Sequence, residues 1–201
     1  RLFEVVDRLP YCGRYPKYHL IYPMLLRILY GCGLRLNEAL LLKTGDVDTT
    51  QGVLYLSNTK NRSQRCVPMS VSLWKYVEYY LEQMAYPPDY NGYFFTSPDG
   101  NHYNSTPVYV MMKKYMKAAH ISREDGTPPR VHDLRHTFAV HALEKMDREG
   151  YDLYYALPIL STYLGHGSIR STEKYLRLTF ETRDSITDSM SGIYHDIFPE
   201  V

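Results

Sequence analysis

The chain has 201 residues, of which 44% are hydrophobic and 22% charged, and its formal net charge at pH 7 is only +1. These values are typical of a globular domain with a sizeable core, and no apolar run approaches the roughly 20 residues that a membrane-spanning helix needs. So small a net charge does not indicate nucleic-acid binding, and any such surface must be a local basic face. Because the first residue is Arg1 rather than Met, we expect a fragment of a longer protein.

The three cysteines, Cys12, Cys32 and Cys66, are too few and too scattered for a disulfide framework or a zinc site. They indicate reduced thiols in a cytoplasmic protein. The 21 tyrosines are unusually many. Most are expected to be half-buried, because a phenol ring combines an apolar body with a polar tip.

The first third of the chain predicts two helices. Apolar residues at helical spacing favour a helix over Leu20–Tyr30, which ends at the glycines of Gly31-Cys32-Gly33. A second helix is expected from about Leu36 to Leu42, with Arg35 at its start. Arg35 would thus lie next to a glycine turn, at the end of a helix that carries unpaired backbone N–H groups.

Two short strands, Val53–Leu56 and Arg65–Met69, follow with a polar turn between them. This turn carries Lys60 and Arg62. Residues Asp46–Asp48 are a candidate third strand. The pattern predicts one small antiparallel sheet.

The rest of the chain is expected to be helical, with capping residues before apolar periodic segments and glycine or proline after them. The predicted helices are Ser72–Tyr86 (ended by Pro87), Thr106–Ala119, His132–Lys145, Ala156–Leu164 (ended by Gly165), and a last one that Ser171 or Thr172 caps and that contains Tyr175. Residues Lys145–Leu157 are expected to form an inserted surface turn. The predicted fold class is α+β, mainly α-helical with one small antiparallel β-sheet.

His132 and Arg135 are three residues apart on one predicted helix, so both side chains can face the same ligand. The arginine offers a planar fork of donors that matches phosphate oxygens. A solvated helix start, in which His132 caps and Arg135 pairs with an acid, is equally open from this pair alone. His132 and His136 have the spacing of a helical metal pair, but no glutamate stands beside His132, which disfavours a metal site.

Arg35 is a second candidate for anion binding, because free backbone N–H groups at a helix start add to its charge. Glu38 can orient Arg35 or form a plain ion pair within the helix, and the sequence leaves both open. Lys60 lies on the predicted turn, where a surface charge is the ordinary interpretation. Arg62 and Arg65 are its rivals.

His166, directly after a glycine helix stop, is placed to donate a hydrogen bond to an anion; interaction with the helix dipole is the alternative. Tyr175 follows nine residues later, after Ser171-Thr172-Glu173-Lys174. Packing is the ordinary role of any single tyrosine. Tyr163 and Tyr194 are the nearest rivals, and neither follows such a segment.

In this order, the segments resemble the catalytic domain of the tyrosine recombinases, the phage integrase family, and especially integrases of mobile genetic elements. The resemblance covers roughly Arg1 to Leu178, which implies a catalytic domain over residues 1–178 and a C-terminal tail over 179–201 that neighbouring protomers exchange. It is carried by five segments: Gly33–Glu38, Lys60–Pro68, His132–His136, Leu164–His166 and Ser171–Tyr175.

The resemblance implies site-specific DNA cleavage and rejoining through a 3′-phosphotyrosyl intermediate, without a cofactor or a metal. It assigns catalytic roles to six residues: Arg35, Lys60, His132, Arg135, His166 and Tyr175. The implied partner is double-stranded DNA. On DNA the chain is expected to form a homotetramer, and when free it is expected to be a monomer. Accessory DNA-bending proteins are further implied partners. The implied location is the bacterial cytoplasm, in association with the nucleoid. A type IB topoisomerase-like relaxation activity and a catalytically inactive DNA-binding relative are the alternatives.

Overall fold

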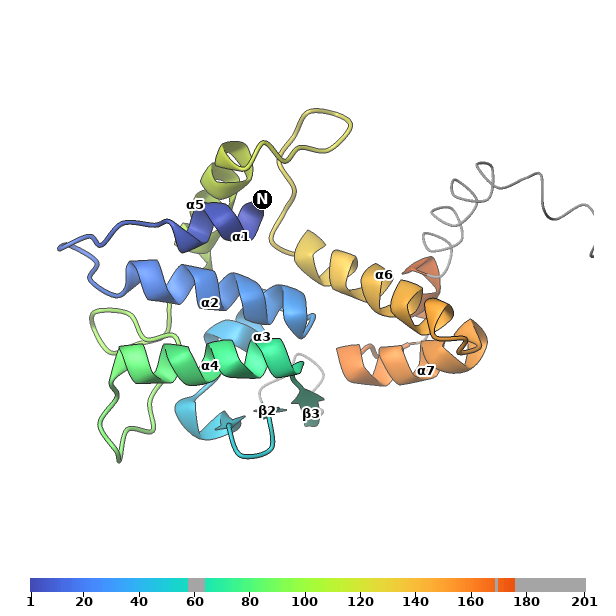
Figure 1. Cartoon of the computed structure of the whole chain (residues 1–201), viewed down its shortest axis with the longest axis horizontal. Helices are drawn as coiled ribbons and strands as arrows, with labels where there is room; N and C mark the ends of the chain where they lie inside the picture. Colours follow the sequence, from blue (N-terminus) through green and yellow to red (C-terminus); the bar gives the residue numbers. More distant parts are fainter. Residues whose placement is uncertain (58–63, 169, 176–201) are drawn as a thin grey trace, which may run out of the picture. The chain divides into compact units, whose positions relative to one another are not determined.

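The computed structural model describes residues 1–57, 64–168 and 170–175, and this part is mainly helical with one three-stranded antiparallel sheet (Figure 1). The predicted fold class is therefore confirmed. The chain divides into two compact units, Arg1–Phe138 and Ala139–Val201. The expected boundary between a domain over 1–178 and a tail over 179–201 stays a prediction, and the tail lies outside the described residues. In the described part, no helix has the length and hydrophobicity that crossing a membrane requires.

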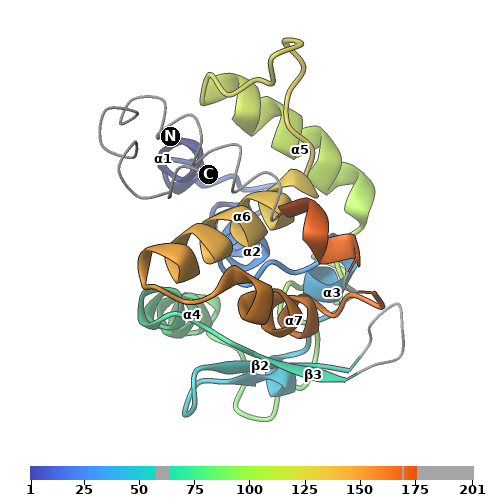
Figure 2. The same ribbon diagram turned by 90° about the vertical axis from the view of Figure 1, so that its right-hand side faces the viewer.

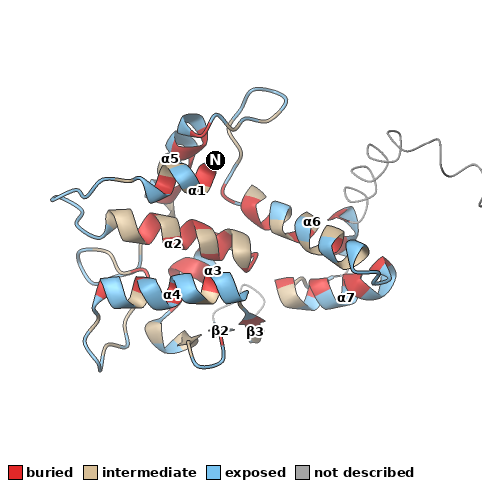
Figure 3. Cartoon of the chain, viewed as in Figure 1, coloured by how far each residue is buried: buried red, intermediate tan, exposed pale blue. Residues whose placement is uncertain are grey.

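The first unit is built around helix α2, Tyr18–Gly31, which Figure 3 shows in the colours of buried and intermediate residues. Its side chains Leu25, Leu26 and Ile28 are fully buried. Helices α1 and α4 pack against it on either side. The bounds of the other helices that begin in this unit are α1 Leu2–Asp7, α3 Leu36–Leu40, η1 (a 3-10 turn) Thr44–Asp46, α4 Val71–Met84, α5 Ser105–Ala118 and α6 Asp133–Arg148.

The sheet has the order β1-β2-β3, with strands Val47–Asp48, Val53–Leu56 and Arg65–Pro68. All three predicted strands are confirmed, and β2 and β3 lie side by side in Figure 2. Leu56 pairs with Arg65 at one end of the β2–β3 ladder. Leu54, Leu56 and Val67 are buried, so one face of the sheet contributes to the core.

Ser72 and Thr106, the residues expected to cap two of the helices, each lie two residues after the observed cap, because another polar side chain lies nearer the first free N–H group. Helix α4 is capped by Ser70, whose hydroxyl accepts from the Leu73 N–H, and not by Ser72. Helix α5 is capped by Asn104, whose side chain accepts from the Thr106 N–H, so Thr106 lies in the first turn.

Helix α1 was not predicted, since it has six residues and no side-chain cap. Tertiary contacts hold it instead. Arg27 of α2 forms two hydrogen bonds with the Asp7 carboxylate, at 2.7 and 2.6 Å, and its guanidinium lies 4.9 Å from the centre of the Phe3 ring. An isolated helix of this length is not stable in water, so packing decides its formation.

The second unit contains most of α6 and the whole of α7, Leu153–Leu164. The expected inserted turn over Lys145–Leu157 was wrong, because α6 continues to Arg148 and the Asp152 side chain caps α7 by accepting from the Tyr154 N–H. Only residues 149–152 connect the two helices. Helix α7 ends at Gly165 as predicted, with a left-handed φ of 65°.

A further helical segment covers residues 170–175. Ser171 and Thr172 lie inside it, one and two residues after its first described residue, so the prediction that one of them caps the helix was wrong. Tyr175 is helical as expected.

Candidate active site

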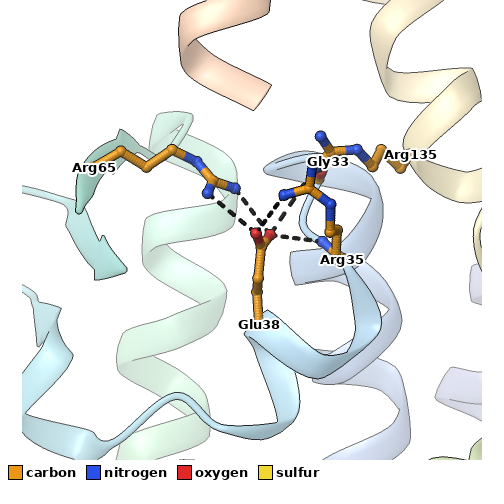
Figure 4. A network of polar contacts seen from close by, with 5 residues as sticks. All are labelled: Gly33, Arg35, Glu38, Arg65 and Arg135. Carbon is orange, nitrogen blue, oxygen red and sulfur yellow. Dashed lines mark hydrogen bonds and ion pairs between the residues drawn. The ribbon is translucent and has the colours of Figure 1, made fainter. Parts of the chain in front are cut away.

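Glu38 of α3 is the centre of a buried polar cluster in the first unit, and its side chain is only 3% exposed. The Arg35 guanidinium donates to Glu38 Oε1 at 2.8 Å (Figure 4). Arg65 of β3 donates to both carboxylate oxygens, from Nη1 to Oε1 at 3.1 Å and from Nη2 to Oε2 at 2.9 Å. Arg135 of α6 places its Nη1 atom 3.9 Å from Oε2. One carboxylate therefore joins three arginines from separate segments.

Arg35 is the N-cap residue of α3, and its backbone N–H donates to Glu38 Oε2 at 2.9 Å. Glu38 thus caps its own helix and also binds the side chain of the N-cap residue. The sequence left open whether Glu38 forms an ion pair within the helix or orients Arg35. The geometry combines an intrahelical pair with contacts to arginines from two other segments.

Arg135, in the first turn of α6, is 1% exposed. Its Nη1 atom donates to the backbone carbonyl oxygen of Gly33 at 2.7 Å. Gly33 has a φ of 59°, in the left-handed region that favours glycine, and this conformation directs its carbonyl group. The residue pair Arg35 and Arg135, 100 positions apart in the sequence, lies against the same glutamate.

The Glu38 carboxyl is held in its charged form. Burial raises the pKa of the Glu38 carboxyl, but hydrogen bonds from the Arg65 side chain and the Arg35 backbone N–H, together with the charge of Arg65, outweigh burial and bring the pKa below its ordinary value of 4.5. Glu38 is therefore ionised at neutral pH, and arginine is always protonated. Among the described residues of this cluster, three guanidinium groups face one carboxylate, an arrangement that suits the binding of an anion.

His132 is exposed and immediately precedes α6, with its ring centre 4.6 Å from that of His136 in an edge-on arrangement. The neighbouring Asp133 side chain accepts from the Arg130 backbone N–H at 2.9 Å and pairs with the side chains of Arg123 and Arg130. Burial raises the pKa of Asp133, but these partners lower it below its ordinary value. Asp133 therefore holds the start of α6, next to His132, against the preceding loop.

In the second unit, His166 and Tyr175 lie together. Their rings are nearly parallel, with centres 6.2 Å apart and an interplanar angle of 22°. The Nδ1 atom of His166 and the Oγ1 atom of the fully buried Thr172 share a hydrogen bond of 2.8 Å, and Tyr175 is 1% exposed. The ammonium group of Lys174 lies 4.9 Å from the centre of the Tyr175 ring.

Of the six predicted site residues, Lys60 lies outside the described residues. Arg65, which the sequence suggested only as a rival of Lys60, proves to be the principal partner of Glu38, and its side chain is 8% exposed. The alternation of side chains along a strand could have indicated that Arg65 faces the interior, because Arg65 and Val67 lie on the same face of β3 and Val67 is fully buried. An inward-facing arginine needs a carboxylate partner.

Comparison with known proteins gives residues 9–182 as a match to the phage integrase family. A putative integrase/recombinase of Sinorhizobium fredii, y4rE, is 34% identical over 154 residues, which cover 76% of this chain and 49% of the relative. The tyrosine recombinase XerC of Chlorobaculum parvum is 35% identical over 170 residues, which cover 81% of this chain and 47% of the relative. The chain thus spans about half the length of these curated relatives.

Solved structures agree in fold. The crystal structure of XerA recombinase matches with a TM-score of 0.69 and 23% identity, over 90% of this chain and 60% of the other. The catalytic domain of bacteriophage HP1 integrase matches with a TM-score of 0.56 and 24% identity, over 100% of this chain and 94% of the other. With the family match over most of its length and relatives above 30% identity, the chain belongs to the phage integrase family, the tyrosine recombinases.

Proposed function

We propose that the chain is the catalytic part of a site-specific recombinase that cleaves and rejoins double-stranded DNA, in the integration or excision of a mobile element. The observation that supports this most is the meeting of Arg35 and Arg135, 100 positions apart in the sequence, at one buried glutamate. Family membership supplies the class of reaction. A fold neighbour, XerH site-specific recombinase, is bound to palindromic difH substrate in a post-cleavage complex; it matches with a TM-score of 0.71 and 21% identity over 92% of this chain and 49% of the other.

In the proposed reaction, Arg35, Arg135 and His166 bind the non-bridging oxygens of the scissile phosphodiester. The guanidinium fork matches these oxygens, and stabilising the charge that develops on them is the main requirement of phosphoryl transfer. The Tyr175 hydroxyl oxygen attacks phosphorus. The new tyrosine–phosphorus bond replaces the bond to the 5′-oxygen, so that a 3′-phosphotyrosyl link and a 5′-hydroxyl are formed.

Two proton transfers accompany this exchange of bonds. A phenol has a pKa of about 10 in water, so its proton must leave as the oxygen attacks, and His132 is the proposed acceptor. Lys60 is the proposed donor of the proton that the departing 5′-oxygen takes up. Rejoining is the reverse sequence with a 5′-hydroxyl from another strand, and the phosphotyrosyl ester conserves the bond without an added nucleotide.

The proposed partner is the DNA duplex, with a homotetramer assembled on two sites from free monomers and accessory DNA-bending proteins as further partners. Contacts to phosphates make such binding strongly dependent on salt. The tail 179–201 is the proposed exchanged segment. If a chain ending at residue 178 assembles on DNA as the 201-residue chain does, the tail has no such role.

The test is covalent trapping on nicked suicide duplexes with randomised sequence around the nick, at low salt. We expect an adduct that survives denaturing electrophoresis, with the DNA attached to Tyr175 by mass spectrometry and one sequence enriched. Tyr175→Phe, which keeps the ring, is expected to bind DNA and form no adduct. An adduct in that variant excludes Tyr175 as the nucleophile, and supercoil relaxation without strand exchange between two sites would favour a topoisomerase instead.

A further inference from the structure

Arg65 is the most completely engaged partner of Glu38, although the proposed reaction gives it no role. Its fork occupies both carboxylate oxygens at 3.1 and 2.9 Å, whereas the Arg35 side chain reaches Oε1 and Arg135 approaches only Oε2. Arg65 is also the first residue of β3, in a register that pairs it with Leu56. The fork is therefore fixed to the sheet, and the carboxylate is fixed to the fork.

The arrangement has a consequence for the charges of the two other arginines. A buried carboxylate with one arginine partner would neutralise that arginine and compete with any anion for its donors. Because Arg65 occupies both oxygens of Glu38, the carboxylate contacts Arg35 and Arg135 without pairing fully with either of them. Removing Arg65 would leave Glu38 to move onto the two remaining arginines.

We propose that Arg65 is a positioning residue for Arg35 and Arg135, acting through Glu38. It holds the carboxylate at a fixed point between the two arginines and prevents the carboxylate from neutralising them. The proposal rests on the proposed function, in which these two arginines bind the scissile phosphate. It assigns to Arg65 no contact with DNA, so its effect belongs to the cleavage step and not to affinity.

The test compares Arg65→Met and Arg65→Lys with the unchanged 201-residue chain, on the suicide duplex that the trapping experiment enriches. At saturating DNA, Arg65→Met is expected to form the adduct about 10²-fold more slowly, since a small displacement of catalytic groups has an effect of this size. The dissociation constant for DNA is expected to stay within about twofold. Arg65→Lys, which keeps the charge without the fork, is expected to have an intermediate rate.

Arg27→Met is the matched control, because Arg27 also forms a two-bond pair with a carboxylate, that of Asp7, and its side chain is 11% exposed. It lies on α2, where its guanidinium contacts Asp7, Tyr76 and Phe3. Its loss is therefore expected to lower the temperature of unfolding without slowing adduct formation. The double variant Glu38→Gln with Arg65→Met removes both members of this pair, so neither side chain is left buried without the other. We expect the double variant to cleave no more slowly than Glu38→Gln alone. If Arg65 acts only through Glu38, removing Arg65 has no further effect once the carboxylate is gone.

A second measurement does not depend on activity. In NMR spectra, the ¹⁵Nε–¹Hε signals of Arg35 and Arg135 can be assigned because each disappears when that arginine is replaced by lysine. We expect these signals to shift or broaden in Arg65→Lys and to stay unchanged in Arg27→Met. The positioning role alone is overturned if the wild type cleaves and the Arg65 variants show the same rates and signals as the wild type. Additive losses of rate in the double variant would overturn it as well. If the wild type forms no adduct, the proposed function is contradicted, and the NMR signals alone then test the positioning role. If Arg65→Met does not fold, Arg65→Lys and the double variant test it.

Discussion

The Arg135 guanidinium donates a 2.7 Å hydrogen bond to the backbone carbonyl oxygen of Gly33, a residue 102 positions earlier in the chain. Gly33 lies two residues before Arg35, so this bond ties the glycine turn of one proposed phosphate-binding arginine to the side chain of the other. The geometry requires a φ of 59° at Gly33, which an L side chain adopts at a cost of roughly 1–2 kcal/mol.

Gly33→Ala is therefore expected to lower the free energy of unfolding by about 1 kcal/mol and to slow adduct formation, because relief of the strain moves the carbonyl group that Arg135 binds. Thermal unfolding and single-turnover trapping measure the two effects. Gly100→Ala is the matched control, since Gly100 has a φ of 81° and there is open space where an alanine Cβ atom would lie. If both variants cleave equally fast, the Gly33 carbonyl does not orient Arg135.

The two arginines are expected to differ in what their removal does to the fold. Arg35→Ala and Arg135→Ala should each slow adduct formation by about 10²–10³-fold, as loss of one donor to a developing oxyanion does. The Arg35 side chain is 26% exposed and that of Arg135 1% exposed. We expect Arg135→Ala to lower the free energy of unfolding by about 3 kcal/mol and Arg35→Ala by about 1 kcal/mol. Denaturant titration of both variants gives these values, and equal losses would contradict the difference in burial.

Glu38 is expected to make stability depend on acidity. Its pKa in the folded chain is below the ordinary 4.5, so between the two values the unfolded chain binds more protons. The contribution of Glu38 is present above pH 4.5 and is lost as the pH falls through the folded-state pKa. The melting temperature of the unchanged chain should therefore fall more steeply below pH 4.5 than that of Glu38→Gln. Parallel curves would show that the arginines do not depress this pKa.

Thr172 is expected to fix the ring of His166 through the 2.8 Å hydrogen bond to Nδ1. Thr172→Val keeps the shape of this fully buried side chain but removes the bond, so adduct formation should slow by roughly tenfold while the variant stays folded. Thr162→Val is a control in the same unit, because the Thr162 hydroxyl donates to the Pro158 carbonyl at 2.9 Å, within α7. Equal rates in the two variants would remove the proposed role of Thr172.

The elements that depend on neighbours in sequence were largely predictable. Apolar periodicity gave α2, the glycine stop gave the end of α7, and two short segments on either side of a polar turn gave strands β2 and β3. Cap positions were less accurate, as at Ser70 and Asn104, because several polar residues compete for the same N–H groups within a few positions. The short helix α1 was missed since its stability comes from Arg27 and other distant partners.

The sequence by itself determined which motifs the chain carries and in what order, since each motif is a local pattern of side chains and turns. Only the tertiary structure decided that Glu38 joins Arg35, Arg65 and Arg135, and that Arg65 lies in the interior. Three segments far apart in the chain supply these arginines. Their meeting depends on how the sheet and helices pack, and a buried carboxylate is stable there only because the arginines offset the cost of removing its charge from water.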